Sequence, residues 1–303
     1  MFDYLGARAV AMIVRMGSFE AAAQMLNVTP SAVSQRIKSL EDRMGTVLIH
    51  RGQPCRATEA GARLCRHMEH VSMLEAAFFA DFPGIAPSGP TSGVTLEIAT
   101  NSDSLGSWLL PGLASFAEQS AYLFNIAIDD EHHTAEWLHQ GRVLAAVTSL
   151  ERPVRGCVVH ALGRLRYFAT ASPEFIDRYF PEGVTPETLA KAPALMFNQK
   201  DNHQIAWVQQ QFCEHPVLPC HFLPSTQGFV DACCAGLGWG MNPASLVKHH
   251  LASGALVHLH DGQPYDVSLF WQISRLAADP LQALTQAVIM AAKRGLEPPV
   301  ATA

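Results

Sequence analysis

Four polar side chains recur at helical spacing within the segment 18–41: Ser31, Ser34, Gln35 and Lys38. Their i, i+3, i+4 and i+7 positions place them on one face of a helix. Hydroxyl, amide and ammonium groups on such a face can hydrogen-bond to base edges in the major groove of DNA. An ordinary solvated helical hairpin would show the same periodicity, so at this point both interpretations stand.

The residues around this polar face predict two short helices joined by a tight turn. Apolar side chains repeat at helical spacing on both helices: Phe19, Ala22, Ala23 and Leu26, then Val33, Ile37 and Leu40. Thr29 is a favourable N-cap for the second helix, and Pro30 at its first position loses only an amide that would be unpaired there. Thr29 and Pro30 join the candidate DNA contacts, because the start of such a helix enters the groove.

The flanking segments complete a small domain. A helix is predicted over 4–16, a short strand over 47–49 and a turn over 50–54. Together these segments predict a wing-like β-hairpin beside the two helices. Arg51 and Arg56 are placed there to contact backbone phosphates, which would add salt-dependent affinity without reading sequence.

The charge distribution supports a nucleic-acid partner at one end only. The 303-residue chain has a formal net charge of −6. Residues 1–66 carry nine Lys/Arg against five Asp/Glu, a net of +4, whereas residues 67–303 carry twelve against twenty-two, a net of −10. A basic head on an acidic body is consistent with DNA binding by the head.

A long helix should follow the wing, with Thr58 as its N-cap and its end near Phe82. An apolar heptad pattern typical of a two-stranded coiled coil runs along it: Leu64, Val71, Leu74 and Phe78. His67 also falls in this seam, and a helix packed on its own domain is the alternative. Because a proline- and glycine-rich linker follows at 83–90, we expect the helix to pair two copies of the chain.

Beyond residue 90, strand-like and helix-like segments alternate, which predicts parallel sheets covered by helices. The expected strands are 94–100, 122–128, 144–147, 167–171, 194–197, 220–223, 239–242 and 267–273. The expected helices are 103–116, 134–140, 173–179, 205–212, 228–235, 244–252 and 281–294. The strand at 267–273 should cross back to the first set, so we expect two lobes joined by a hinge, with a cleft between them.

Candidate ligand contacts lie where the expected strands end, because ligands of open parallel sheets bind there beside helix N-termini. Ser102 and Ser104 could hold a carboxylate and Asp103 an ammonium, although Ser102 could equally serve only as a helix cap. The acidic run Asp129, Asp130 and Glu131 could bind a cationic group or form a solvated surface. The remaining turns supply Thr148, Ser149, Asn198, Thr226 and Gln227.

Other motifs carry no functional assignment. The glycines of 236–240 follow a helix and precede a strand, the reverse of a dinucleotide-binding loop. The Cys and His pairs lack repeated ligand spacing, and Cys233 and Cys234 are expected in the core. We therefore expect no metal, no cofactor and no enzymatic activity. The apolar run 9–14 is too short for a signal peptide or a membrane span, so a cytoplasmic protein without a membrane partner is expected.

The head resembles a known family. Residues 1–66 are similar to the winged helix-turn-helix of the LysR-type transcriptional regulators, through AAAQMLNVTPSAVSQRIKSLEDRMGTVLIHR and then ATEAG. NSDSLGSWLLPGL at 101–113 is similar to the lysine- and arginine-sensing branch, usually called ArgP or LysG, and the similarity continues to about residue 295. The resemblance implies a periplasmic-binding-protein-like body, a tetramer, contact with RNA polymerase and an amino-acid exporter gene as target.

The chain departs from that branch at two positions. Where the relatives tend to place acids in the second lobe, this chain has Asn198 and Gln227. A neutral amide cannot supply the full charge complement for a guanidinium or an ammonium. A basic amino acid such as lysine or arginine is therefore the expected effector, and a neutral or otherwise altered effector is the alternative.

The predicted fold class is α/β, with an N-terminal all-α winged helix-turn-helix and a C-terminal periplasmic-binding-protein-like effector domain of two subdomains. The expected domains are 1–57 for DNA binding, 58–90 for dimerisation, 91–166 with 274–303 for the first effector subdomain, and 167–273 for the second. The expected partners are double-stranded promoter DNA, a small effector and further copies of the chain, as a homodimer or homotetramer. A solute receptor and an architectural DNA-binding protein with an empty cleft are the rival interpretations.

Overall fold

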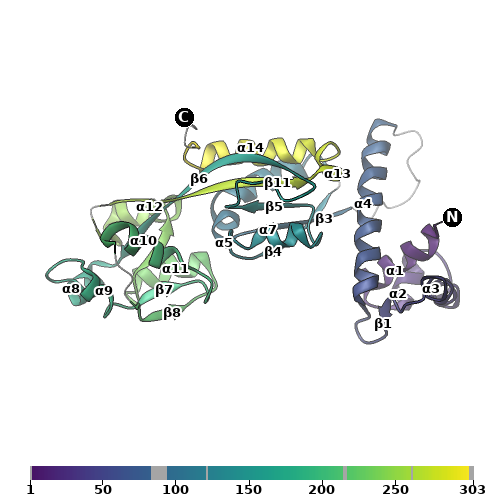
Figure 1. Cartoon of the computed structure of the whole chain (residues 1–303), viewed down its shortest axis with the longest axis horizontal. Coiled ribbons are helices and arrows are strands. Elements are labelled where there is room, and N and C mark those ends of the chain that lie inside the picture. The colour runs from purple at the N-terminus through teal and green to yellow at the C-terminus, as the bar shows by residue number, and fades with distance from the viewer. Residues whose placement is uncertain (1, 83–93, 121, 214–216, 261, 300–303) are drawn as a thin grey trace. The chain divides into compact units, whose positions relative to one another are not determined.

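The computed structural model describes residues 2–82, 94–120, 122–213, 217–260 and 262–299. The chain forms two compact units, Met1–Thr95 and Leu96–Ala303, which are described separately. Figure 1 shows the elements of both. The linker predicted at 83–90 lies outside the described residues. None of the described helices is both long enough and apolar enough to cross a membrane.

The first unit is a helical head with a small β-hairpin. Its elements are α1 (Tyr4–Met16), α2 (Phe19–Met25), α3 (Pro30–Met44), β1 (Ile49–His50), β2 (Arg56–Ala57) and α4 (Glu59–Asp81). The cap predicted for the second helix is confirmed, because Thr29 Oγ1 accepts a hydrogen bond from the Ala32 amide at 3.2 Å. Thr58 likewise caps α4 by accepting from the Gly61 amide at 3.1 Å.

The apolar faces predicted for the helical hairpin form the core of this unit. Val33, Ile37 and Leu40 are at most 2% exposed, and they pack with buried residues of α1, α2 and the start of α4. Gly61 is required at the start of α4, since a Cβ there would lie 1.9 Å from the Leu48 carbonyl oxygen. The helix therefore packs directly on the backbone of the wing.

The strand predicted over 47–49 starts later, at Ile49. The preceding backbone is bound by side chains instead of by a strand. The Leu48 amide donates to Glu41 Oε1 at 2.7 Å, and the Val47 carbonyl accepts from Thr58 Oγ1 at 2.7 Å. These contacts hold Val47 in an exposed position outside the hairpin.

The second unit contains a seven-stranded sheet in the order β10-β6-β11-β5-β3-β4, with β9 also paired to β6. Its strands are β3 (Thr95–Thr100), β4 (Leu123–Ile128), β5 (Ala145–Thr148), β6 (Cys157–Ala171), β9 (Gly240–Pro243), β10 (Val257–His258) and β11 (Tyr265–Ser274). A second, two-stranded sheet pairs β7 (Ala194–Met196) with β8 (Cys220–Phe222).

The sequence predicted parallel sheets, and the structure is mixed. β3 and β5 run parallel, as do β7 and β8, but β11 is antiparallel to β5 and β6. β6 spans 15 residues from Cys157, whereas only 167–171 was expected to be a strand. The two long strands β6 and β11 connect the lobes side by side (Figure 1), so the crossover segments pair with each other as an antiparallel ribbon.

The helices of this unit divide between two lobes. The first lobe carries β3–β5 with α5 (Ser102–Ser104), the π-helical segment η2 (Leu105–Leu109), α6 (Leu110–Ala117), α7 (Thr134–His139), α13 (Arg275–Ala278) and α14 (Gln282–Gly295). The second lobe carries β7–β9 with α8 (Pro173–Tyr179), α9 (Pro186–Leu189), α10 (His203–Phe212), α11 (Thr226–Cys234) and α12 (Ala244–Ser253). The helix predicted over 103–116 thus starts one residue earlier and contains a π-helical turn.

Candidate functional site

The face of α3 predicted to meet DNA is open. Ser31, Gln35 and Lys38 are exposed and Ser34 is partly exposed, while the opposite apolar face is buried. Thr29 and Pro30, at the start of the helix, are also exposed. Lys38 makes no ion pair with any residue that the structure describes. The surface is therefore free to receive a nucleic acid.

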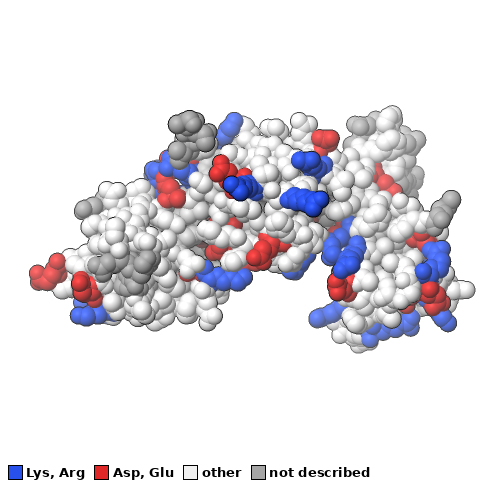
Figure 2. Space-filling view, in the orientation of Figure 1, with Lys and Arg blue, Asp and Glu red and all other residues white. Residues whose placement is uncertain are grey.

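The wing adds two exposed cations. Arg51 lies in the turn between β1 and β2, with its guanidinium 5.3 Å from the Phe19 ring centroid of α2. Arg56 begins β2 and pairs in register with His50. The Cys55 amide donates to the Gly17 carbonyl at 2.7 Å, which fixes the wing to the turn between α1 and α2. In Figure 2, Lys and Arg side chains line the edge of this unit where Figure 1 draws α2, α3 and β1.

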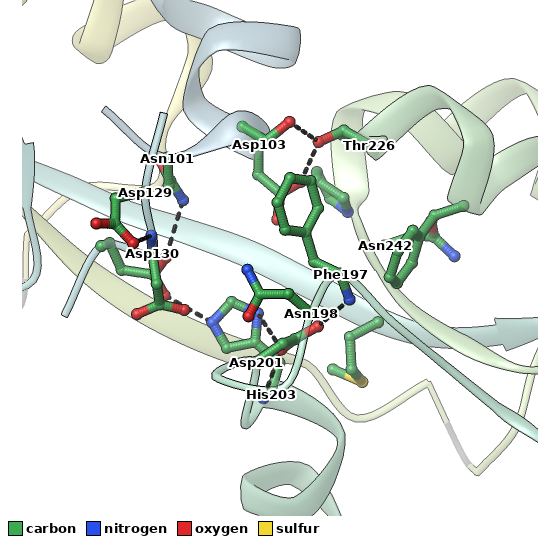
Figure 3. A pocket seen from close by; sticks show the side chains of 15 residues that line it. Asn101, Asp103, Asp129, Asp130, Phe197, Asn198, Asp201, His203, Thr226 and Asn242 are labelled. Atoms are coloured by element: carbon green, nitrogen blue, oxygen red, sulfur yellow. Dashed lines mark hydrogen bonds and ion pairs between the residues drawn. The ribbon is translucent and has the colours of Figure 1, made fainter. Parts of the chain in front are cut away.

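A pocket in the second unit lies where β3, β4 and β7 end and where α5, α10 and α11 begin (Figure 3). Its empty volume, including the part open to solvent, is about 510 Å³. The described residues that line it are Asn101, Ser102, Asp103, Asp129, Asp130, Glu131, Phe197, Asn198, Asp201, His203, Thr226, Phe229, Met241, Asn242 and Pro243. Five of them are carboxylates.

Asp103 joins the two lobes at one end of the pocket. Its Oδ1 accepts a hydrogen bond from Thr226 Oγ1 of α11 at 2.6 Å, and its Oδ2 accepts from the Tyr167 hydroxyl of β6 at 2.9 Å. Thr226 Oγ1 also lies 2.9 Å from Ser102 Oγ. In Figure 3, Thr226 approaches Asp103 from the other side of the pocket, so these hydroxyls hold the cleft closed at this point.

Burial raises the pKa of Asp103, and hydrogen bonds from Thr226 and Tyr167, together with the positive charge of His203, partly offset that rise. The pKa of Tyr167 is well above its ordinary value, because the phenol is buried and faces the charge of Asp103. Tyr167 therefore stays protonated and acts as a donor.

Glu131 and His203 form a second contact between the lobes. His203 Nε2 lies 2.7 Å from Glu131 Oε1, and the side chains are 10% and 2% exposed. The other carboxylate oxygen of Glu131 accepts from Asn101 Nδ2 at 3.1 Å. Burial acts to lower the pKa of His203, but the charge and hydrogen bond of Glu131 raise it to about 9. The pKa of Glu131 is lowered in turn, since the attraction of His203 outweighs the effect of burial.

The remaining carboxylates differ in how they are held. Both oxygens of Asp201 accept backbone amides, from Phe197 at 2.8 Å and from His203 at 3.1 Å. Asp129 accepts from Trp137 Nε1 at 3.0 Å and lies 3.4 Å from Lys200 Nζ of the second lobe. Burial acts to raise the pKa of Asp129, but these hydrogen bonds and the charge of Lys200 leave it below its ordinary value.

The acidic run is completed by Asp130. Its Oδ1 accepts from the amide and from Nδ1 of His132, at 2.9 and 3.0 Å, and these bonds bring its pKa below the ordinary value despite burial. Asp129 and Asp130 are therefore ionised at neutral pH.

The structure brings together seven of the eleven effector contacts expected from the sequence: Ser102, Asp103, Asp129, Asp130, Glu131, Asn198 and Thr226. Ser104, Thr148, Ser149 and Gln227 do not line the pocket. Thr148 and Ser149 instead bind the backbone carbonyl of Glu131, at 2.9 and 3.0 Å, and so position that residue. Ser104 is buried in α5, and Gln227 is exposed and donates to Asp231 Oδ1 at 3.2 Å.

Sequence reasoning missed several pocket residues, of which Asn101, Asp201 and His203 have the largest consequences. A signal was present, because Asp201 and His203 lie between the end of β7 and the first residue of α10, as Asp129–Glu131 follow the end of β4. Asn101, and not Ser102, caps the helix, with its Oδ1 accepting from the Ser104 amide at 3.2 Å. The Ser102 side chain therefore does not cap the helix and lines the pocket instead.

The pocket offers a metal ion no open set of ligands among the described residues. Asp130, Glu131 and His132 present ligand atoms within 4.8 Å of one another. Glu131, however, already has both oxygens bound, and His132 is bonded to Asp130. Elsewhere, Cys233 is fully buried and burial raises the pKa of its thiol to about 12, which is consistent with the core position expected for it.

The helix α4 is only partly packed on its own unit. Leu64 is buried in the head, as the alternative to a coiled coil predicted. Further along, Leu74 and Phe78 are 48% and 50% exposed. The second half of the predicted seam is thus available to another surface.

Comparison with known proteins identifies both units. Residues 7–62 match the family described as bacterial regulatory helix-turn-helix protein, lysR family, and residues 89–295 match the LysR substrate binding domain. The regulator LysG of Mycobacterium tuberculosis is 42% identical over 284 residues, which is 94% of this chain and 91% of that protein.

Solved structures agree over nearly the whole chain. The crystal structure of ArgP from Mycobacterium tuberculosis has a TM-score of 0.79 at 39% identity and covers 99% of this chain and 100% of that one. Full-length LysG from Corynebacterium glutamicum with bound effector Arg has a TM-score of 0.68 at 35% identity and covers 98% and 100%. The chain therefore belongs to the LysR family of bacterial DNA-binding transcriptional regulators, alongside LysG and ArgP.

Proposed function

We propose that a cationic amino acid, most readily arginine or lysine, binds in the acidic pocket and controls the affinity of this regulator for promoter DNA or the bend that it imposes on that DNA. The observation that carries the proposal is the convergence of five carboxylates on one pocket between the lobes. Of the described side chains that line it, His203 alone can carry a positive charge. A guest with a positive side chain would offset this excess of negative charge.

The neutral residues Asn198 and Gln227 do not remove the acidity of the second lobe. Asp201 supplies a carboxylate there, three residues after Asn198, while Gln227 does not line the pocket. The amide of Asn198 and the hydroxyl of Ser102 would then hydrogen-bond the α-carboxylate or α-amino group of the ligand, since both line the same space.

The position of the pocket between the lobes gives the ligand a way to act. A ligand shifts an equilibrium only through different affinities for two arrangements of the protein. Thr226 and His203 of the second lobe bond to Asp103 and Glu131 of the first. A bound amino acid would add further contacts between the lobes and so stabilise one closed arrangement of them. We propose that this difference reaches the DNA through the pairing of α4 between copies of the chain.

For the head, we propose that the polar face of α3 faces the major groove through Ser31, Ser34, Gln35 and Lys38. Thr29 and Pro30, at the start of α3, would lie at the edge of the groove. Arg51 and Arg56 would contact phosphates. The support is their shared exposure on α3 and the wing of one small unit. The domain divisions 1–57, 58–90, 91–166 with 274–303, and 167–273 are also proposed, and the two compact units and the two lobes of the second unit support them. An amino-acid exporter gene as target, contact with RNA polymerase and action in the cytoplasm, where the chromosome is, complete the proposal.

The test is a binding screen by thermal shift and calorimetry with L-arginine, L-lysine, L-histidine and neutral amino acids. We expect a basic amino acid to stabilise the protein and to change the mobility of its promoter complex in a gel shift. Binding confined to a neutral amino acid would support the alternative raised by Asn198. Promoter binding that no amino acid alters at millimolar concentration would contradict effector control.

A further inference from the structure

His203 places a positive charge inside the pocket before any ligand arrives. Its ring nitrogen Nε2 contacts Glu131 Oε1 at 2.7 Å, and both side chains are almost entirely buried. The pair joins α10 of the second lobe to the segment after β4 of the first lobe. Because a buried carboxylate requires a compensating charge, this histidine neutralises one of the five acids.

Glu131 has no carboxylate oxygen left without a donor. Oε1 is held by His203 and Oε2 by Asn101 Nδ2 at 3.1 Å, while His132 Nδ1 lies 3.7 Å from Oε1. The backbone carbonyl of the same residue is bound by Thr148 and Ser149. A ligand cation could reach Glu131 only by displacing protein donors.

The surroundings of His203 keep its ring in place. Its other nitrogen Nδ1 lies 3.9 Å from Asp201 Oδ1, and the rings of Tyr167 and Tyr265 pack at 4.8 and 5.7 Å between centroids. Asp103, Asp130 and His132 also act on it electrostatically. The acids and the aromatic rings favour the imidazolium form, and they outweigh burial and the repulsion from His132.

We propose that His203 is a specificity-determining positioning residue, an internal counter-ion that reserves Glu131 and leaves Asp129 and Asp130, whose partners Lys200 and His132 are exposed, to a ligand's cation. This inference rests on the proposed function, that a cationic amino acid binds in this pocket. It assigns different roles to acids that the sequence presents as one run. Glu131 ties the lobes together, and its neighbours select the charge of the ligand.

The experiment compares the affinities of L-arginine and L-citrulline, which share their α-groups and differ in the charge of the side chain. The measured quantity is the ratio of the two dissociation constants, obtained by calorimetry. For His203→Gln, Glu131 is left without its counter-ion, so the preference for arginine should rise by roughly tenfold because an added negative charge acts on the cation. For the double variant His203→Gln/Glu131→Gln, it should return to within about twofold of wild type.

Two single variants distinguish the role of Glu131 from that of Asp129, and neither requires that His203→Gln folds. In Glu131→Gln the carboxylate and the reason for the histidine charge disappear together, so the preference for arginine should stay near that of wild type. In Asp129→Asn a ligand-facing charge is lost, and the preference should fall by roughly tenfold. An equal fall in both variants would overturn the proposal, because it would mean that the ligand cation pairs with Glu131.

A direct measurement is available from ¹⁵N-histidine NMR of the full-length protein at pH 7.5. The imidazolium signal of His203, assigned by its absence from His203→Gln, should be present with and without saturating arginine, and should be lost in Glu131→Gln. Its loss on adding arginine to wild type would refute the proposal, since arginine would then have displaced His203. Absence of both arginine and lysine binding to wild type would refute the proposed basic effector and this inference with it, whereas normal arginine binding with an unchanged ratio in all variants would refute this inference alone.

Discussion

Replacing Lys38 by alanine should weaken promoter binding and reduce its dependence on salt. Lys38 is exposed on the polar face of α3 and makes no ion pair with any described residue, so its charge is available to a phosphate. Each neutralised phosphate contributes about 0.9 to the slope of log K against log salt. For two copies on a two-fold-symmetric site, the slope should therefore fall by about 1.8.

Between 50 and 200 mM salt, a slope change of about 1.8 corresponds to a roughly twelvefold change in the ratio of wild-type to variant affinity. Fluorescence anisotropy with a promoter fragment at four salt concentrations would measure it. The loss should be greatest at low salt, where counterion release contributes most.

A matched control lies on the same helix. Arg43 is also exposed, but its Nη2 lies 3.0 Å from Asp3 Oδ2, so its charge is already compensated. Arg43→Ala should leave the salt slope close to that of wild type, and Lys38→Arg should restore it. Parallel lines of equal affinity for wild type and Lys38→Ala would refute the assignment of Lys38 as a DNA contact.

Three further predictions concern the effector unit and the assembly. Thr226→Val removes the hydroxyl that bonds Asp103 and Ser102 across the cleft, so arginine affinity measured by calorimetry should fall about tenfold, with Thr226→Ser as the restoring control. The pair of Glu131 and His203 should stabilise the fold fully only between pH 4.5 and 6.5. Its contribution is lost as the pH falls through the lowered pKa of Glu131, and also as the pH rises through the pKa of His203 at about 9. In urea titrations, the unfolding free energies of wild type and His203→Gln/Glu131→Gln should therefore converge at both pH extremes. Phe78→Glu places a charge on the exposed half of α4, and light scattering should show a smaller assembly, whereas an unchanged mass would exclude this surface from the pairing.

The helical head was predictable because its determinants are local. Thr29 and Pro30 start α3 through contacts within one turn, and the apolar stripe of Val33, Ile37 and Leu40 repeats with the period of the helix. The start of β1 was wrong by two residues for a reason that no period reveals. Leu48 is bonded to a side chain of α3 seven residues away.

The pocket was predictable only in part. Strand ends supplied Ser102, Asp103, the acidic run and Thr226, because residues at the ends of parallel strands converge. The first ten residues of β6 escaped notice, since its partner β11 lies about a hundred residues further on. Tyr167 was expected in a strand, but its hydrogen bond to Asp103 was not foreseen.

The sequence by itself determined the units, their element types and the acidic character of the cleft, because periodicity, capping and charge composition are properties of short segments. Tertiary structure alone decided that Glu131 is compensated by His203. His203 and Glu131 are 72 residues apart and meet only when two lobes close around an antiparallel ribbon. Since the energy of a buried charge depends on its neighbours in space, no spacing along the chain could show which carboxylate keeps its counter-ion.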